Sequence, residues 1–308
     1  MEVLWQSEII INIFLQNIGD WLVPLMRFLS FLGQEETYIL IVPLLYWCVD
    51  IELSMRFIVV LLLSAYSNAI LKLTFHGARP YWLDNRVLPL SSEKSFGIPS
   101  GHAQNAASVW GVMASYYKNR FVKLFFIILI FLIGFSRLYL GVHFSSDVIA
   151  GWLLGGILLL AIIKLEPTFR KWFNAKSMAT QLLYLGSASL IMLFAGLVWL
   201  NIQSQVPIPD LWLQNTAGYS NIQPVAPYMP NDIVSFSGIF LGITAGYIWV
   251  KHHMAYDPSI GTYTQKATRL FVGMVGTLII VYGLGSIFPF SSSSDTAGII
   301  SRYVRYTV

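Results

Sequence analysis

Three short segments place charged and ionisable side chains inside a strongly apolar sequence. They are KLTFHGARP (72–80), FGIPSGHAQ (96–104) and SRLYLGVHFSSD (136–147). An Arg or Asp in the middle of a membrane helix costs roughly 2.5–3.5 kcal/mol on insertion scales, so such residues usually serve a function. The segments supply three cations, two histidines, one carboxylate and a Ser-Gly pair, namely Lys72, Arg79, Ser100, Gly101, His102, Arg137, His143 and Asp147.

The cations predict a binding site for an anion with several oxygens, of which phosphate is the clearest case. Guanidinium groups such as those of Arg79 and Arg137 bind phosphate through two parallel hydrogen bonds, whereas Lys72 acts as a point charge. Ser100 and Gly101 precede an apolar helical run, so backbone N–H groups and the positive end of a helix dipole would face the same anion.

The histidines predict chemistry beyond binding. His143 and Asp147 are four residues apart and share a helix face if a helix begins there. A carboxylate bonded to one imidazole nitrogen fixes the tautomer and leaves the other nitrogen free as a nucleophile. His102 lies on a different helix and is suited to protonate a leaving alkoxide and then activate water. This set predicts phosphoryl transfer through a phosphohistidine.

The elements that must position these residues are membrane helices. The chain has 308 residues, of which 56% are hydrophobic and 11% charged, and its mean hydropathy is +0.64. We therefore expect an all-α, polytopic transmembrane bundle of about eight spans, because a span takes roughly 20 residues. Residues 9–32 contain Gly19, Pro24 and polar interruptions such as Asn12 and Gln16, and are expected to form interfacial amphipathic helices rather than a ninth span. The expected spans are 36–49, 55–75, 103–117, 121–139, 146–165, 182–201, 233–250 and 269–289.

Two further patterns indicate local structure. Residues 201–232 contain five prolines and are expected to form a structured loop rather than a helix. Gly151 and Gly155 have the spacing of small residues that usually indicates close helix packing.

The distribution of basic residues predicts the orientation. With these spans, one face holds eleven Lys or Arg residues, and the other holds five besides the three cations of the motifs. The richer face is expected to be cytoplasmic, so the motifs lie on the opposite side. The eleven are Arg56, Lys118, Arg120, Lys123, Lys164, Arg170, Lys171, Lys176, Lys251, Lys266 and Arg269, and the five are Arg27, Arg86, Lys94, Arg302 and Arg305.

The three segments resemble the signature motifs of the type 2 phosphatidic acid phosphatase (PAP2) superfamily, in the family's order and internal spacing. The motifs are Lys72-x6-Arg79-Pro80, Pro99-Ser100-Gly101-His102 and Ser136-Arg137-x5-His143-x3-Asp147. The resemblance implies that His143 is the nucleophile, Asp147 its partner and His102 the acid/base. It also implies phosphate binding by the remaining motif residues, with no metal and no cofactor: Lys72, Arg79, Ser100, Gly101 and Arg137.

The resemblance also implies a domain layout and a localisation. Residues 1–180 are expected to form the PAP2-like catalytic core with its N-terminal interfacial segment, and 181–308 to add transmembrane helices packed on it. The extra spans and the segment 31–50 look like the layout of sphingosine-1-phosphate phosphatases and bacterial relatives. The expected localisation is a multi-pass integral membrane protein, in the plasma membrane of a bacterium or archaeon rather than an organelle.

The sequence is compatible with several substrates and with more than one class of protein. The substrate is a lipid phosphate or pyrophosphate: phosphatidate, phosphatidylglycerophosphate, isoprenyl pyrophosphate or a sphingoid phosphate. The alternatives are a transporter or binding protein for an anionic lipid, and a phosphatase of a small soluble ester. The charge of +4 and pI near 9.0 do not indicate nucleic-acid binding, since excess basic residues beside a membrane give the same balance. The oligomeric state is not determined by the sequence.

Overall fold

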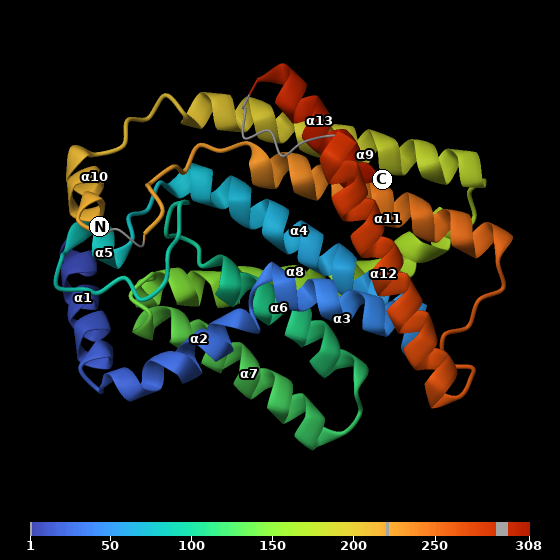
Figure 1. Cartoon of the computed structure of the whole chain (residues 1–308), viewed down its shortest axis with the longest axis horizontal. Helices are drawn as coiled ribbons and strands as arrows, with labels where there is room; N and C mark the ends of the chain where they lie inside the picture. The colour runs from blue at the N-terminus through green and yellow to red at the C-terminus, as the bar shows by residue number, and fades with distance from the viewer. Residues whose placement is uncertain (1, 220–221, 288–294) are drawn as a thin grey trace. The chain divides into compact units, whose positions relative to one another are not determined.

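The computed structural model of the chain describes residues 2–219, 222–287 and 295–308, and these residues form helices and connecting loops without a strand (Figure 1). The all-α prediction is therefore confirmed. In chain order the helices are α1 (Glu2–Gln16), η1 (Asp20–Leu22), α2 (Val23–Phe31), α3 (Glu35–Cys48), α4 (Ile51–Phe75), α5 (Pro80–Leu83), α6 (Gly101–Tyr116), α7 (Arg120–Tyr139), α8 (Ser145–Asn174), α9 (Met178–Gln203), α10 (Asp210–Ala217), α11 (Asn231–His253), α12 (Tyr263–Ile287) and α13 (Thr296–Thr307).

The helices fall into two compact units, each built from segments far apart in the sequence. Unit 1 contains Met1–Thr37, Ser67–Leu160 and Trp199–Tyr228, and it carries all three motifs. Unit 2 contains Tyr38–Tyr66, Ala161–Val198 and Met229–Val308. The site can therefore be described within unit 1 alone.

The chain is a multi-pass membrane protein, but the expected number of about eight spans is not confirmed. Among the described residues, five helices are long and apolar enough to cross a bilayer, and the end of the expected span 269–289 lies outside these residues. The helices α3 and α6 have 14 and 16 residues, which is short of the roughly 20 that a span requires. The five are Ile51–Leu83, Arg120–Tyr139, Ser145–Asn174, Met178–Gln203 and Asn231–His253.

The N-terminal segment forms two short helical arms instead of one straight span. Trp5–Gln16 and Asp20–Phe31 meet at an angle of 85°, and they would count as a sixth span only if the bent pair crosses as one. The bend lies at Gly19, whose φ of 130° is readily adopted only by glycine. The sequence had indicated a break at this position.

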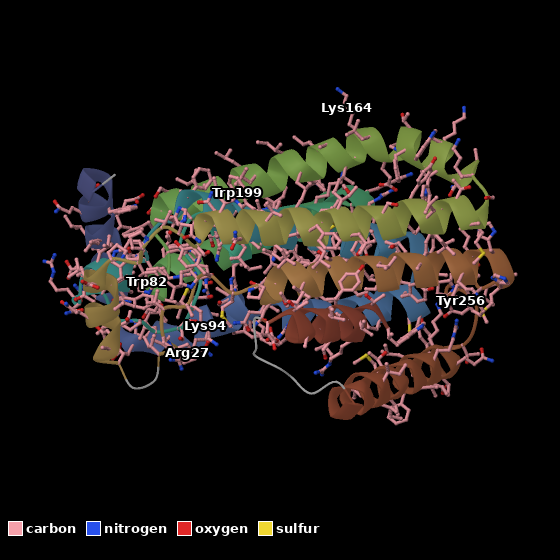
Figure 2. The ribbon with its side chains drawn as sticks, turned by 90° about the horizontal axis from the view of Figure 1, so that it is seen from above. Arg27, Trp82, Lys94, Lys164, Trp199 and Tyr256 are labelled. Atoms are coloured by element: carbon pink, nitrogen blue, oxygen red, sulfur yellow. The ribbon has the colours of Figure 1, made fainter. Side chains whose placement is uncertain are left out.

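The segment between α9 and α11 differs from expectation. Residues 201–232 were predicted to form a loop because they contain five prolines, yet α9 extends to Gln203 and α10 forms inside the segment. Pro209 is the N-cap of α10, where a proline costs no hydrogen bond. The helix packs on α5, with the rings of Trp212 and Trp82 5.3 Å apart and Asn215 donating to the Trp82 carbonyl at 2.9 Å. Arg27, Trp82 and Lys94 lie at the end of unit 1 that contains α5 and α10 (Figure 2).

In unit 2, glycines allow close packing of α13 on α11. A Cβ at Gly242 would lie 2.3 Å from the Thr307 carbonyl oxygen, and one at Gly238 would lie 2.8 Å from that of Tyr303. The Ser189 hydroxyl lies 2.7 Å from the Tyr303 hydroxyl and donates to the Ser237 carbonyl at 2.7 Å. These contacts place the amphipathic C-terminal helix against the transmembrane helices of the same unit.

In unit 1, α8 lies directly against α6 through the small residues that the sequence pattern had indicated. A Cβ at Gly151 would lie 2.6 Å from the Ser100 carbonyl oxygen, and one at Gly155 would lie 2.3 Å from that of Gln104. Since a backbone oxygen cannot move aside as a side chain can, only glycine fits at these positions. This packing joins the helix of the second motif to the helix that follows the third.

We predict that Gly155→Ala destabilises the purified protein, because the added methyl overlaps backbone. The expected cost is about 1–3 kcal/mol, measured by thermal unfolding in detergent. Gly156→Ala is the matched control, since a Cβ there would meet no atom within 4 Å and alanine favours the helix. Equal stability of the two variants would contradict the close packing of α6 and α8.

Candidate active site

Backbone hydrogen bonds join the three motifs directly. The Gly97 N–H donates to the Gly77 carbonyl at 2.8 Å, and the Ser100 N–H donates to the Asp147 carbonyl at 3.0 Å. Gly97 lies so close to its neighbours that a Cβ there would be 2.5 Å from the Ala78 carbonyl oxygen and 3.2 Å from Asp147 Oδ2. The loop before α6 is therefore held between the other two motifs.

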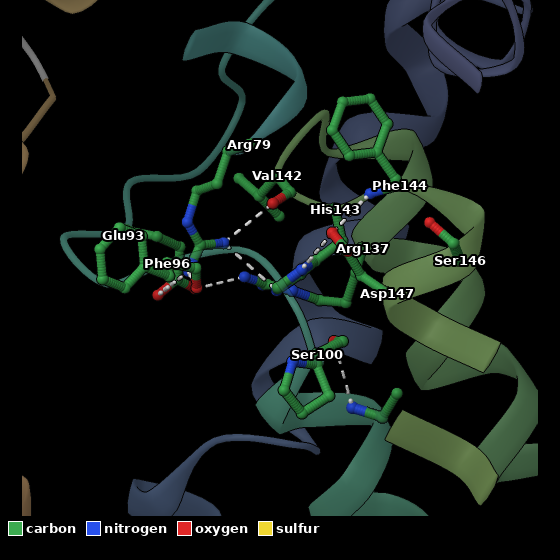
Figure 3. A network of polar contacts seen from close by, with 12 residues as sticks. Arg79, Glu93, Phe96, Ser100, Arg137, Val142, His143, Phe144, Ser146 and Asp147 are labelled. Carbon is green, nitrogen blue, oxygen red and sulfur yellow. Dashed lines mark hydrogen bonds and ion pairs between the residues drawn. The ribbon is translucent and has the colours of Figure 1, made fainter. Parts of the chain in front are cut away.

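Arg79 lies within the resulting network of polar contacts and is fully buried (Figure 3). Its Nε donates to the Ser95 carbonyl at 2.7 Å, its Nη2 to the Phe96 carbonyl at 3.0 Å and its Nη1 to the Val142 carbonyl at 2.8 Å. The same Nη1 lies 3.2 Å from Nε2 of His143. The guanidinium thus holds the second and third motif loops around a fixed positive charge.

The contacts of His143 determine its tautomer. Arginine can only donate, so Nε2 of His143 accepts from Arg79 and the ring proton resides on Nδ1. Nδ1 lies 3.2 Å from Oδ2 of Asp147, which also accepts from the Phe144 N–H at 2.9 Å. Burial lowers the pKa of His143 well below its ordinary value, and Arg79 and Arg137 lower it further. His143 is therefore neutral, with its lone pair on the side of the cations.

Arg137 is also fully buried, and its partner is a residue that the sequence did not single out. Its Nη2 forms an ion pair with Glu93, and its Nη1 donates to the Ser30 hydroxyl. Glu93 Oε2 also lies 3.9 Å from Arg79 Nη2. Burial alone would raise the pKa of Glu93, but Arg137 and Arg79 outweigh it and lower the pKa to about 2. No motif or spacing marks Glu93, because it lies in an irregular loop.

The remaining predicted site residues lie in the same unit. Lys72 Nζ donates to the Ser95 hydroxyl at 2.8 Å. Ser100 is the N-cap of α6, with its hydroxyl accepting from the Ala103 N–H, and Gly101 is the first helical residue. Two nitrogens, Nε2 of His102 and Nε of Arg137, are buried without a hydrogen-bond partner among the described residues. Hydrogen bonds and ion pairs, some of them through Ser95 and Glu93, connect six of the predicted residues into one cluster, and Gly101 and His102 follow Ser100 in α6. The six are Lys72, Arg79, Ser100, Arg137, His143 and Asp147.

A polar network formed by residues of α4 and α6 supports the second motif. The Asn68 amide donates to the Pro99 carbonyl at 3.2 Å and to Gln104 Oε1 at 2.9 Å, and the Gln104 amide donates to the Ser67 hydroxyl at 3.0 Å. A Cβ at Gly101 would lie 2.9 Å from Asn68 Oδ1, so glycine is needed for this approach. The sequence signal for these residues was available: Asn68 lies one turn before Lys72, and Gln104 two residues after His102.

The described residues contain no group of three or more His, Cys, Asp or Glu side chains that could hold a metal ion. The ionisable groups of this cluster include the cations Lys72, Arg79 and Arg137 and the carboxyl groups of Glu93 and Asp147. Such an arrangement is suited to bind an oxyanion through fixed cations.

This combination of fold and motifs defines a class of membrane phosphatases, and sequence comparison agrees. The profile of the PAP2 superfamily matches residues 53–171, and that of its phosphatase transmembrane extension matches residues 234–308. The chain belongs to the PAP2 superfamily.

Three relatives illustrate the range of this family. The chain is 31% identical over 150 residues to an undecaprenyl-diphosphatase of Sulfolobus acidocaldarius, covering 47% of this chain and 70% of the relative. It is 39% identical over 106 residues to phosphatidylglycerophosphatase B of Bacillus subtilis, covering 32% of this chain and 49% of the relative. It is 30% identical over 159 residues to mouse sphingosine-1-phosphate phosphatase 2, covering 48% and 42%. The chain thus spans less than half the length of the last two.

The ion pair of Glu93 predicts a pH-dependent contribution to stability. A carboxylate whose pKa falls on folding stabilises the protein above its unfolded pKa, and this contribution is lost as the pH falls through the folded value. We therefore expect wild type to be more stable than Glu93→Gln above about pH 5, and the difference to shrink between about pH 4.5 and 2.

The measurement is thermal unfolding in detergent across this pH range. Glu52→Gln is the control, since Glu52 pairs with Arg170 at an exposed site where an ion pair contributes only about 0–1 kcal/mol. A stability difference for Glu93→Gln that grows on acidification would contradict the assigned ion pair.

Proposed function

We propose that this protein is an integral-membrane lipid phosphate phosphohydrolase that removes a terminal phosphate from a lipid phosphate or pyrophosphate. The observation that carries the proposal is the buried cluster in which Arg79 contacts Nε2 of the neutral His143 and Asp147 contacts Nδ1 of the same ring. A purely structural ion-pair cluster needs no imidazole between a guanidinium and a carboxylate.

In the proposed reaction, Nε2 of His143 attacks the phosphorus atom while the bond from phosphorus to the leaving oxygen breaks. His102, whose protonated form is favoured by the negative charge of the bound phosphate, donates its proton to that oxygen, so the lipid leaves as an alcohol or a shorter phosphate. His102 then takes a proton from a water molecule, whose oxygen attacks the phosphohistidine. The phosphorus–nitrogen bond breaks, inorganic phosphate is released and His143 returns to its neutral form.

The other residues of the motifs would bind and stabilise the phosphoryl group. Arg79 and Arg137 are fixed by burial and by protein partners, so they need little rearrangement as charge develops on the phosphate oxygens. Lys72 adds a third cation, and Ser100 with Gly101 presents the start of α6. We assign no metal and no cofactor to the reaction.

The lipid nature of the substrate is supported by the membrane helices and by the names of the relatives. Phosphatidate, phosphatidylglycerophosphate, isoprenyl pyrophosphate and sphingoid phosphates are all candidates. We propose that the whole chain has about eight spans and interfacial N-terminal helices, that residues 1–180 form the PAP2-like catalytic core, and that 181–308 add transmembrane helices to it. By the distribution of Lys and Arg, the site would face the non-cytoplasmic side, in the plasma membrane of a bacterium or archaeon.

The direct test follows phosphate release by purified protein in detergent with EDTA present. The panel contains these lipid phosphates and a water-soluble sugar phosphate. We expect turnover of at least one lipid phosphate in EDTA and a loss of at least about a thousandfold in kcat for His143→Gln. His253→Gln is the control, because His253 is an exposed residue of α11.

Each of the other outcomes would contradict one part of the proposed function. Full turnover by His143→Gln would exclude it as the nucleophile. Binding of lipid phosphates without release by wild type would favour a transporter or binding protein. Preference for the sugar phosphate over every lipid would favour a phosphatase of small soluble esters.

A further inference from the structure

The N-terminal helix α1 lies outside the matched family profiles. One face of this helix lies along the turn that carries His143. The turn joins α7 to α8 and spans residues 140–144. The residues of this face are spaced by three or four positions, which places them on one side of a helix, and they are Trp5, Glu8, Asn12 and Gln16. Ile10 and Phe14, between them in sequence, are 66% and 67% exposed, as expected of the opposite side.

Asn12 contacts the backbone of the histidine itself. It is 1% exposed, and its side-chain N–H groups donate to the carbonyls of Leu138 at 2.8 Å and His143 at 3.1 Å. Its own Oδ1 is buried without a hydrogen-bond partner among the described residues. An unpaired buried amide oxygen costs stability. If this position served packing alone, an apolar side chain of similar size would avoid that cost.

Gln16 and Glu8 fix the two ends of the same segment. The Gln16 amide donates to the carbonyls of Leu88 and Tyr139 at 2.7 and 3.2 Å and accepts from the Leu88 N–H at 3.0 Å. Glu8 accepts from the N–H and the hydroxyl of Ser146, both at 2.8 Å, in the first turn of α8.

The turn depends on this support because it contains little regular structure of its own. Gly141 has a φ of +72°, and a Cβ at that position would lie 2.8 Å from Nε2 of Gln16. Trp5 stacks on Phe144, with ring centroids 6.0 Å apart and an interplanar angle of 11°. The hydrogen bonds described for Glu8, Asn12 and Gln16 therefore reach the turn, its immediate flanks or the Leu88 loop.

We propose that Glu8, Asn12 and Gln16 are positioning residues, which hold the His143 turn so that the imidazole keeps its orientation toward the phosphate pocket. The inference rests on the proposed function in so far as His143 is the nucleophile. A misplacement of reacting groups by about 1 Å can cost about a hundredfold in rate, so a distant support of this kind can act on kcat without touching substrate.

The test compares Asn12→Leu, which keeps a similar volume but has no donor, with Asn17→Leu as matched control. Asn17 is an exposed amide just beyond the end of α1. We expect Asn12→Leu to lower kcat about 10–100-fold while KM changes less than about twofold, because the phosphate-binding cations are untouched. A change in KM alone, or an unchanged kcat, would overturn the proposal.

A second measurement does not depend on turnover. Hydrogen–deuterium exchange of the full-length protein in detergent, read by mass spectrometry, should become faster for Asn12→Leu in peptides covering 138–146 but not in those covering 72–80. Unchanged exchange in 138–146, or faster exchange throughout unit 1, would overturn the proposal. If wild type released no phosphate from any substrate, the proposed function would fail while this measurement still tested the support of the turn.

A conservative pair protects the test against a folding defect at Asn12. Glu8→Gln can still accept from the Ser146 N–H and donate to its hydroxyl, whereas Glu8→Ala loses both bonds. We expect Glu8→Gln to retain kcat and the wild-type exchange rates, and Glu8→Ala to lower kcat and loosen 138–146. Equal behaviour of the two variants would contradict positioning by hydrogen bonds.

Discussion

The geometry of the site depends on the hydrogen bonds of Asp147. Its carboxylate contacts the His143 ring and accepts from the Phe144 N–H, while its backbone carbonyl accepts from the Ser100 N–H. One residue therefore orients the imidazole, accepts from the backbone N–H just before α8 and attaches the loop of the second motif. Because the side chain is 1% exposed, these bonds form without competition from water.

The buried cations impose the second constraint on this fold. A guanidinium removed from water is stable only if its donors are satisfied, and Arg79 meets this condition mainly through the carbonyls of Ser95, Phe96 and Val142. The loops that contain these carbonyls have no regular secondary structure, and their hydrogen bonds to the charged Arg79 side chain hold them in place. Arg137 obtains the same support from the Ser30 hydroxyl and the Glu93 carboxylate.

Glycines determine how closely the helices and loops that bear these charges can approach. Gly97, Gly101, Gly151 and Gly155 each face a backbone or side-chain oxygen closer than a Cβ would allow. Their positions connect the first motif to the second, and α6 to α8. The chemistry of the pocket therefore depends on small residues that carry no chemistry themselves, because they set the distances between those that do.

The sequence by itself determined the all-α class, the membrane character and the three motifs that the fold joins, because apolar composition and motif spacing are local properties. It also located the break at Gly19 and the close packing at Gly151 and Gly155, since each follows from residue type. It did not predict α10, because proline was taken as a loop signal where Pro209 instead precedes a helix. The expected count of about eight spans was not confirmed.

Only the tertiary structure decided which residues support the site. Glu93 lies in a loop without periodicity, and Asn12 and Gln16 were interpreted as interruptions of an amphipathic helix. Their partners lie between 44 and 131 positions away in the sequence, so no local pattern encodes the pairing. A polar side chain on an apolar helix has the same appearance in sequence whether it faces water or a distant carbonyl, and only the folded chain distinguishes the two.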